Sequence, residues 1–156
     1  MSDVKSVIES GRAVLGIEFG STRIKAVLIG DDHAPIATGA HDWENMLVDG
    51  IWTYSLDMIW EGISDCYSKM AQDAKEKYGV TIKKLAAIGI SGMMHGYLPF
   101  DKEDNLLVPF RTWRNTITEE ASVKLTKLFG YHIPQRWRIE HLYQAILNKE
   151  EHVEAI

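Results

Sequence analysis

Gly20, Ser21 and Thr22 combine small size with two hydroxyl groups at a point that separates two apolar runs. Glycine has no side chain to block a ligand, so nearby backbone N–H groups and the two hydroxyls can point at phosphate oxygens. Glu18 precedes this turn and offers a carboxylate to magnesium, directly or through water. Lys25 follows as a phosphate contact or as a surface lysine. The group is compatible with phosphate binding, but most turns of this composition only connect two strands, so the motif alone favours an ordinary hairpin turn.

A second candidate site is the loop Ser91–Gly96, which follows a short apolar run. Its two glycines make the loop compact and allow His95 to project into a cleft. The imidazole could then donate or accept one hydrogen bond, although a lone histidine is also commonly a core residue. Met94 beside it suits a pocket wall or core packing.

A third group joins an aromatic ring, a cation and an amide in Trp113, Arg114 and Asn115. The tryptophan offers an aromatic platform, and the amide can both donate and accept hydrogen bonds. The chain contains 5 tryptophans, so a packing role for Trp113 is the alternative. An ion pair at the surface is the simplest role for Arg114.

These residues need strands and turns to position them. Period-two alternation predicts strands over Leu15–Phe19 and Ile24–Ile29, and Pro35–His41 is expected to add a third strand. Asp42–Thr53 is rich in turn residues and is expected to be a loop. Apolar residues at intervals of three and four predict a long helix from Ser55 to Tyr78.

The run Leu85–Ile90 has the composition of a parallel strand buried on both faces, which with the preceding strands and helix predicts a mixed α/β sheet. Beyond it the sequence predicts a hairpin from Tyr97–Phe100 and Leu106–Thr112. Two helices follow, one from Thr116 or Thr118 to Phe129 and one from Pro134 through Leu147, with no closing element.

Length and composition limit the classes of protein. The 156 residues suit one domain with a core, and the net charge of −5 gives no reason to expect nucleic acid or an anionic membrane as partner. One cysteine excludes an internal disulfide and suits the cytoplasm. No apolar run approaches the roughly 20 residues of a membrane span. Residues 1–12 are expected to be a polar leader, frayed or helical.

The order and spacing of the three groups resemble the N-terminal part of the FGGY carbohydrate kinases, most closely the xylulokinase-like branch. The resemblance extends from Ala13 to Thr118. It implies an actin-like ATPase domain of the ribonuclease-H type, the first of two domains that close over ATP, Mg²⁺ and a sugar. Residues 13–156 would then be an incomplete N-terminal sugar-binding domain, and the nucleotide-binding domain would lie beyond them.

The resemblance assigns roles residue by residue. Met94 and His95 match a sugar-contacting pair, and Trp113 and Asn115 fall where the family lines its sugar pocket. Glu18 matches an acidic position near the metal. The turn that includes Gly20, Ser21 and Thr22 matches the phosphate-facing hairpin; Lys25 follows it.

Two departures accompany this resemblance. The family usually has aspartate where this chain has Glu18, and its catalytic aspartate lies beyond Ile156. The implied function is ATP-dependent phosphorylation of a ketose such as a pentulose, with these residues alone inactive. The alternative is a non-catalytic actin-like module that binds a sugar or a partner chain. A chaperone-type ATPase is a third hypothesis, and an exposed half-cleft could also promote self-association.

Overall fold

The computed structural model describes residues 3–156, whose contacts separate into two compact units. The first unit contains the chain up to Glu44 together with Leu56–Met93. The second contains Asn45–Ser55 and Met94–Ile156. The candidate phosphate residues therefore belong to the first unit, and the candidate sugar residues belong to the second.

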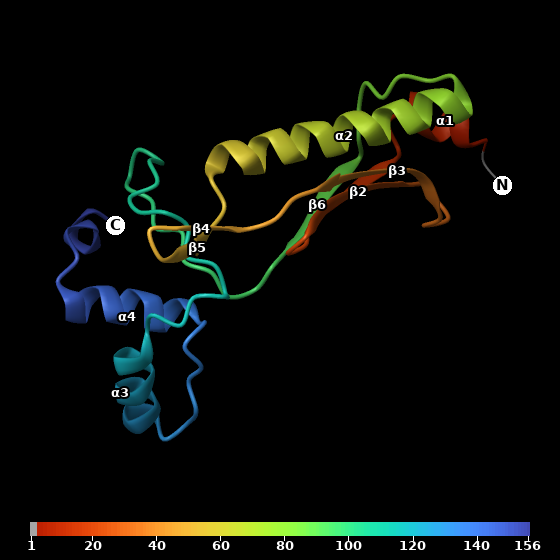
Figure 1. The fold of residues 1–156 in the computed structure, drawn as a ribbon. Helices are drawn as coiled ribbons and strands as arrows, with labels where there is room; N and C mark the ends of the chain where they lie inside the picture. Colours follow the sequence, from red (N-terminus) through yellow and green to blue (C-terminus); the bar gives the residue numbers. More distant parts are fainter. Residues whose placement is uncertain (1–2) are drawn as a thin grey trace. The chain divides into compact units, whose positions relative to one another are not determined.

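A four-stranded mixed sheet in the order β3-β2-β1-β6 forms the base of the first unit (Figure 1). β1 (Val14–Phe19) and β3 (Pro35–Asp42) both pair antiparallel with β2 (Arg23–Ile29). β6 (Ala87–Gly92) pairs parallel with β1. The predicted mixed sheet is confirmed, including the crossover to a parallel strand.

One face of this sheet is covered over β2 and β3 by α2 (Leu56–Tyr78), as Figure 1 shows. Gly39 on β3 permits the close approach, because a Cβ there would lie 2.1 Å from the Cys66 carbonyl oxygen. The Cys66 thiol donates to the Gly39 carbonyl at 3.3 Å. Gly79 follows the helix with φ at 67°, so this helix and its end match the sequence prediction.

The N-terminal segment contributes to the core of the first unit. α1 (Val4–Glu9) is capped by Asp3, whose side chain accepts a hydrogen bond from the backbone N–H of Lys5. Val7 and Ile8 are both buried. The leader is thus helical over these residues, and it packs into the unit instead of standing apart from it.

The predicted burial of the last strand is wrong. β6 is exposed along its whole length, with Ile88 58% and Ile90 72% exposed. Both residues share a sheet face with Leu15 and Ile17 through the register of β6 against β1. An apolar run indicates that a strand is more stable when it is buried. Within residues 3–156, however, no second layer covers β6.

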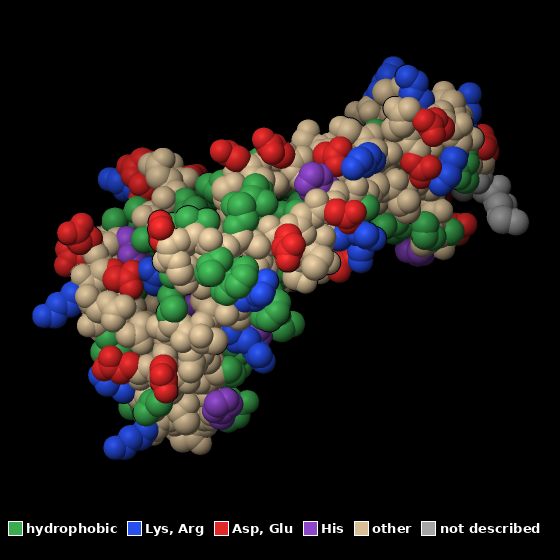
Figure 2. Space-filling view, in the orientation of Figure 1, with side chains coloured by type: hydrophobic (Ala, Val, Ile, Leu, Met, Phe, Trp, Pro, Cys, Tyr) green, Lys and Arg blue, Asp and Glu red, His purple; other side chains and the backbone are tan. Residues whose placement is uncertain are grey.

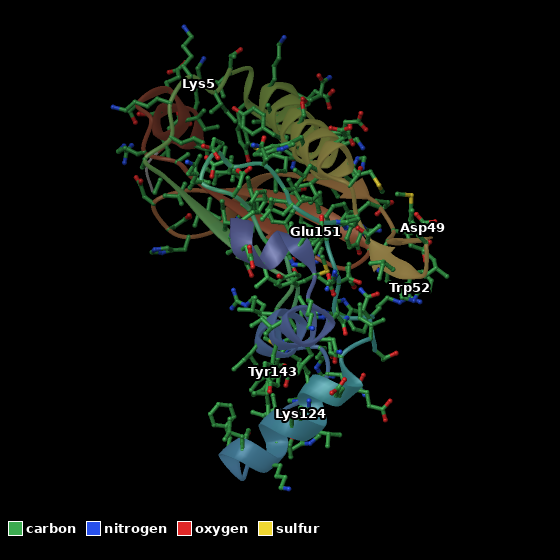
Figure 3. All side chains as sticks on the ribbon, turned by 90° about the vertical axis from the view of Figure 1, so that its left-hand side faces the viewer. Lys5, Asp49, Trp52, Lys124, Tyr143 and Glu151 are labelled. Carbon is green, nitrogen blue, oxygen red and sulfur yellow. The ribbon has the colours of Figure 1, made fainter. Side chains whose placement is uncertain are left out.

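The segment 42–53, expected to be a loop, contains a small hairpin. β4 (Met46–Val48) pairs antiparallel with β5 (Ile51–Thr53) in the second unit. Asp49 and Gly50 have φ values of 49° and 80°, which are the positive values that a two-residue hairpin turn requires. The Asp-Gly pair was the signal for this hairpin. Figure 3 labels Asp49 and Trp52 of this hairpin.

The hairpin predicted for residues 97–112 is only partly formed. Two isolated bridges join Tyr97 to Arg111 and Phe100 to Leu106, without regular strands. Proline has no N–H to donate to a ladder, and the segment includes Pro99 and Pro109. The chain therefore reverses as predicted but does not form a continuous sheet.

Helices complete the second unit. α3 (Glu119–Phe129) ends at Gly130 with φ at 62°, in agreement with the prediction. α4 (Arg138–Asn148) begins later than the predicted start at Pro134, because the Trp137 N–H donates to the Pro134 carbonyl in a preceding turn. A 3₁₀ helix, η1 (Glu151–Ala155), follows, contrary to the expectation of no closing element.

Candidate functional site: the β1–β2 turn and the loop after β6

The β1–β2 turn is held by backbone hydrogen bonds around Gly20. Its N–H donates to the Arg23 carbonyl at 2.9 Å, and a Cβ on Gly20 would lie 2.8 Å from that oxygen. Trp43 donates from Nε1 to the Gly20 carbonyl at 2.8 Å and from its backbone N–H to Thr22. The turn is therefore fixed from both sides, and Thr22 is exposed at its tip.

Glu18 and Lys25 are neighbours across β1 and β2, and their side chains form an ion pair. Lys25 Nζ lies 3.0 Å from Glu18 Oε2, and the two side chains are 49% and 51% exposed. Ser91 on β6 stands beside Glu18 in the parallel register. From the sequence, Glu18 was expected to contact a metal ion and Lys25 a phosphate. In the structure the two side chains contact each other, so each charge is partly neutralised.

A shallow hollow lies on the sheet face that carries this ion pair. Gly16 and Gly89 are neighbours on β1 and β6, so the sheet is bare of side chains between them. A Cβ on Gly89 would meet nothing within 4 Å. The residues that line the hollow are Gly16, Ile17, Glu18, Lys25, Val27, Gly89, Ile90 and Ser91. The surface therefore has room for an anionic group beside one carboxylate, one ammonium and one hydroxyl.

The residues of this turn fit magnesium bound to nucleotide phosphates in one respect. Magnesium commonly keeps several waters and takes one or two carboxylates together with phosphate oxygens, so one exposed carboxylate such as Glu18 is compatible with this mode of binding. Within residues 3–156 no group of three histidine, cysteine or acidic side chains forms a metal site. A dedicated all-protein metal cage is thus absent from the described part of the chain.

In the second unit, the loop that follows β6 presents His95 in an unusual backbone conformation. Its φ is 65°, in the left-handed region. Gly96 is packed so tightly that a Cβ there would lie 2.6 Å from Phe110 Cε2. Tyr97 then exchanges two backbone hydrogen bonds with Arg111, at 2.9 and 3.1 Å. The half-exposed His95 is thereby held at the edge of a fixed segment, while Met94 is 73% exposed.

Trp113 is partly accessible, with 41% of its surface exposed. The neighbouring Arg114 guanidinium lies 3.7 Å from the centre of the Trp52 ring and donates to the Asn45 side chain at 2.8 Å. The sequence suggested a surface ion pair for Arg114. Instead, Arg114 joins the β4–β5 hairpin to the segment that carries Trp113.

Asn115 is 3% exposed, and its amide is fully engaged. Its Oδ1 accepts from the Trp52 N–H at 2.9 Å, and its Nδ2 donates to the carbonyls of Trp52 and Thr112 at 2.8 and 2.9 Å. Both amide hydrogens therefore have partners within the unit. This arrangement braces Trp52 against the segment that carries Trp113.

Trp137, which the sequence did not indicate as a site residue, stacks on His95. The rings of His95 and Trp137 are 6.0 Å apart with an angle of 14° between their planes. The sequence contained no signal for this pairing, because the two residues are far apart along the chain. Trp137 thus joins the surroundings of the candidate sugar site.

A buried cluster lies elsewhere in the second unit. Arg111 pairs with Glu150 and lies 5.4 Å from the centre of the Tyr97 ring, whose hydroxyl is 2.7 Å from His152 Nε2. Burial lowers the pKa of His141 to about 4, lowers that of His152 and raises that of Tyr97. Burial also tends to raise the pKa of Glu150, but Arg111 outweighs it and the pKa is lowered. These partners are internal, so the cluster is structural.

The sequence from residue 13 to 139 matches the N-terminal domain of the FGGY family of carbohydrate kinases. The chain belongs to this family. It is an FGGY kinase N-terminal domain, and the predicted α/β fold is confirmed. A comparison with curated proteins found no significant match.

Solved structures show the same fold at low sequence identity. The domain matches a xylulose kinase from Rhodospirillum rubrum with a TM-score of 0.75 and 16% identity, over 93% of this chain and 31% of that one. It matches a gluconate kinase from Lactobacillus acidophilus with a TM-score of 0.73 and 19% identity, over 92% and 30%. It matches a glycerol kinase from Plasmodium falciparum, solved with ADP, with a TM-score of 0.64 and 15% identity, over 90% of this chain and 29% of that one.

The FGGY domain therefore spans about a third of the length of the kinases that it matches. These neighbours carry the names of different sugar kinases, so they establish the fold and leave the xylulokinase-like branch as a prediction. Among residues 3–156, no helix has both the length and the apolar content to cross a membrane.

Proposed function

We propose that the full-length protein transfers the γ-phosphate of ATP to a hydroxyl of a ketose, such as a pentulose of the xylulose type. Membership of the FGGY family supports a sugar kinase in general. The observation that carries the specific proposal is the segment after β6, in which Met94 is exposed and His95 is fixed at an edge. This segment can present one hydrogen-bonding ring and one apolar side chain to a sugar.

Each candidate residue has a defined part in this proposal. His95 exchanges one hydrogen bond with a sugar hydroxyl, and Met94 and Trp113 provide apolar surface for the carbon skeleton. Asn115 contributes indirectly, because its amide is occupied in bracing Trp52. The sugar would thus be oriented by side chains of the second unit.

The nucleotide side of the proposal rests on the β1–β2 turn. Gly20, Ser21 and Thr22 line the path of the phosphates, and Lys25 can reach an anionic oxygen if it leaves Glu18. Magnesium, when bound, would supply positive charge to the phosphates, with Glu18 holding one of its waters. A catalytic aspartate that accepts the sugar proton would come from outside residues 1–156.

The proposal also assigns partners and a compartment. A C-terminal kinase domain would supply the other wall of the cleft, and these residues alone would be inactive, since phosphoryl transfer depends mainly on positioning and charge stabilisation. The protein would act in the cytoplasm, without nucleic acid or membrane as partner. Self-association of the isolated domain is a further expectation.

Isothermal titration of the full-length protein against a panel of ketoses tests the proposal, with and without a non-hydrolysable ATP analogue and magnesium. Glycerol and gluconate serve as comparison ligands. We expect one ketose to bind more tightly than either. Binding of glycerol or gluconate alone would overturn the ketose assignment, and no binding by any sugar would overturn the kinase proposal.

A second function is a non-catalytic sugar-binding or partner-binding module. The Glu18–Lys25 ion pair favours it, because a carboxylate that is already paired with an ammonium attracts a cation less strongly. The two functions differ in how nucleotide binding depends on metal. If the protein is a kinase, the ATP analogue should bind more tightly with magnesium than without it. If it is a non-catalytic binding module, magnesium should make no difference to binding of the analogue.

A further inference from the structure

The imidazole of His95 is supported on one face by Trp137. The two ring centres are 6.0 Å apart and the planes are nearly parallel at 14°. Both residues are half-exposed, so the pair lies at the surface of the second unit rather than in its core. A stacked pair at a surface restricts the histidine ring to one plane and leaves the ring edge accessible.

The backbone of His95 is restricted independently of this stack. Its φ of 65° is a conformation that residues other than glycine adopt only in special settings. The packing of Gly96 against Phe110 and the paired hydrogen bonds of Tyr97 fix the chain immediately after it. With backbone and ring plane both set, the directions of the two ring nitrogens are defined. No residue within 3–156 forms a hydrogen bond to them.

Trp137 is itself attached to a fixed element. Its N–H donates to the Pro134 carbonyl at 3.2 Å, and its carbonyl accepts from the His141 N–H at 3.3 Å at the start of α4. His141 is fully buried on that helix. The indole is therefore held on a helix that is anchored in its unit.

We propose that Trp137 is a positioning residue for His95 in sugar binding. It holds the imidazole in the plane from which a ring nitrogen can meet a sugar hydroxyl. This inference rests on the proposed function, because it assumes that His95 contacts the sugar. An aromatic pair of this kind corresponds to a factor of about three to ten in affinity.

The test compares Trp137→Ala and Trp137→Phe in the full-length protein, with Trp60→Ala as control, since Trp60 is 66% exposed on α2 in the other unit. Ketose and nucleotide dissociation constants are measured separately. We expect Trp137→Ala to weaken ketose binding about three- to tenfold. We expect Trp137→Phe to retain most of the affinity, and Trp60→Ala to have no effect. Nucleotide binding should remain unchanged in all three.

Two further readouts separate positioning from a merely structural role. The NMR signals of the His95 ring should lie upfield because of the indole ring current and should move downfield in Trp137→Ala. In a His95→Ala background, Trp137→Ala should have little additional effect on ketose binding. Unmoved His95 signals, or an equal loss in that background, would overturn the positioning role alone. Absence of ketose binding by the unsubstituted protein would instead overturn the proposed function and this role together.

Discussion

Asn115 shows how the chemical capacity of a side chain can be predicted from sequence while its hydrogen-bond partners cannot. The family resemblance places Asn115 among the residues that line the sugar pocket. In the structure its amide accepts a hydrogen bond from the Trp52 N–H and donates one to the Trp52 carbonyl, as the backbone of a neighbouring strand would. Sequence gives the chemical capacity of a side chain, but its available hydrogen bonds depend on which backbone groups lie beside it.

We expect Asn115→Ala to destabilise the protein by about 2–3 kcal/mol, because the Trp52 N–H and two carbonyls lose buried partners. Urea denaturation measures the loss. Thr116→Ala is the matched control, since Thr116 is an exposed neighbour and should change stability by less than about 0.5 kcal/mol. Equal effects of the two substitutions would show that the amide does not brace the hairpin.

His141 predicts a pH dependence of stability. It is fully buried and its pKa falls from 6.5 to about 4, so the unfolded chain takes up this proton first as pH is lowered. Stability is therefore lost between about pH 6.5 and pH 4, by up to roughly 3 kcal/mol. The groups that face it are Tyr97, which stacks on its ring, and the charged pair Arg111 and Glu150.

The comparison of His141→Phe with the unsubstituted protein isolates this contribution. The variant keeps a ring against Tyr97 and should lose less stability between pH 7 and pH 5 in urea denaturation. Burial raises the pKa of Glu140, which acts in the opposite direction in both proteins and therefore cancels in the comparison. Identical losses with and without the histidine would contradict the prediction.

At the scale of elements, local signals predicted the sheet and α2 because alternation and helical spacing persist over many residues there. The β4–β5 hairpin was not predicted because its strands are three residues each, too short to show an alternating pattern, although Asp49-Gly50 is a typical hairpin turn. The predicted burial of β6 fails for another reason. Periodicity predicts which face is apolar, whereas burial depends on a second layer that a local pattern cannot supply.

Glycines provide a direct test of how α2 sits on its sheet. Gly39→Ala places a Cβ 2.1 Å from the Cys66 carbonyl oxygen, so we expect a loss of about 3 kcal/mol, at the upper end for overpacking, in thermal or urea unfolding. Gly89→Ala on β6 is the control, because its Cβ would meet nothing within 4 Å. That variant should remain within about 0.5 kcal/mol of the original. A tolerated Gly39→Ala would mean that α2 lies farther from β3.

At the scale of the whole molecule, apolar surface is exposed in both units. The buried residues of α4 include Glu140, His141 and Gln144, while Leu142 and Ile146 are 37% and 48% exposed. Figure 2 shows hydrophobic side chains among the charged ones on the visible surface. Leu142 and Ile146 are four residues apart and so share one face of α4, and apolar residues exposed on one helix face can mark an interface.

We expect the 156-residue chain to self-associate with rising concentration in sedimentation velocity. The double substitution Leu142→Lys and Ile146→Lys should reduce the association, because it places charge on the exposed stripe of α4. Lys124→Glu on the exposed surface of α3 is a control for a change of charge alone. Figure 3 labels Lys124 on that helix. A chain that stays monomeric at all concentrations would contradict this expectation.

We propose that the β1–β2 turn serves the nucleotide and that the His95 loop serves the sugar. Calorimetric titration of each ligand alone against two variants of the full-length protein tests it most directly. Thr22→Val should weaken binding of the ATP analogue at least about tenfold and leave ketose binding unchanged, since a hydrogen bond to a charged group is lost. His95→Ala should do the reverse. Equal loss of both ligands in either variant would contradict the division of roles.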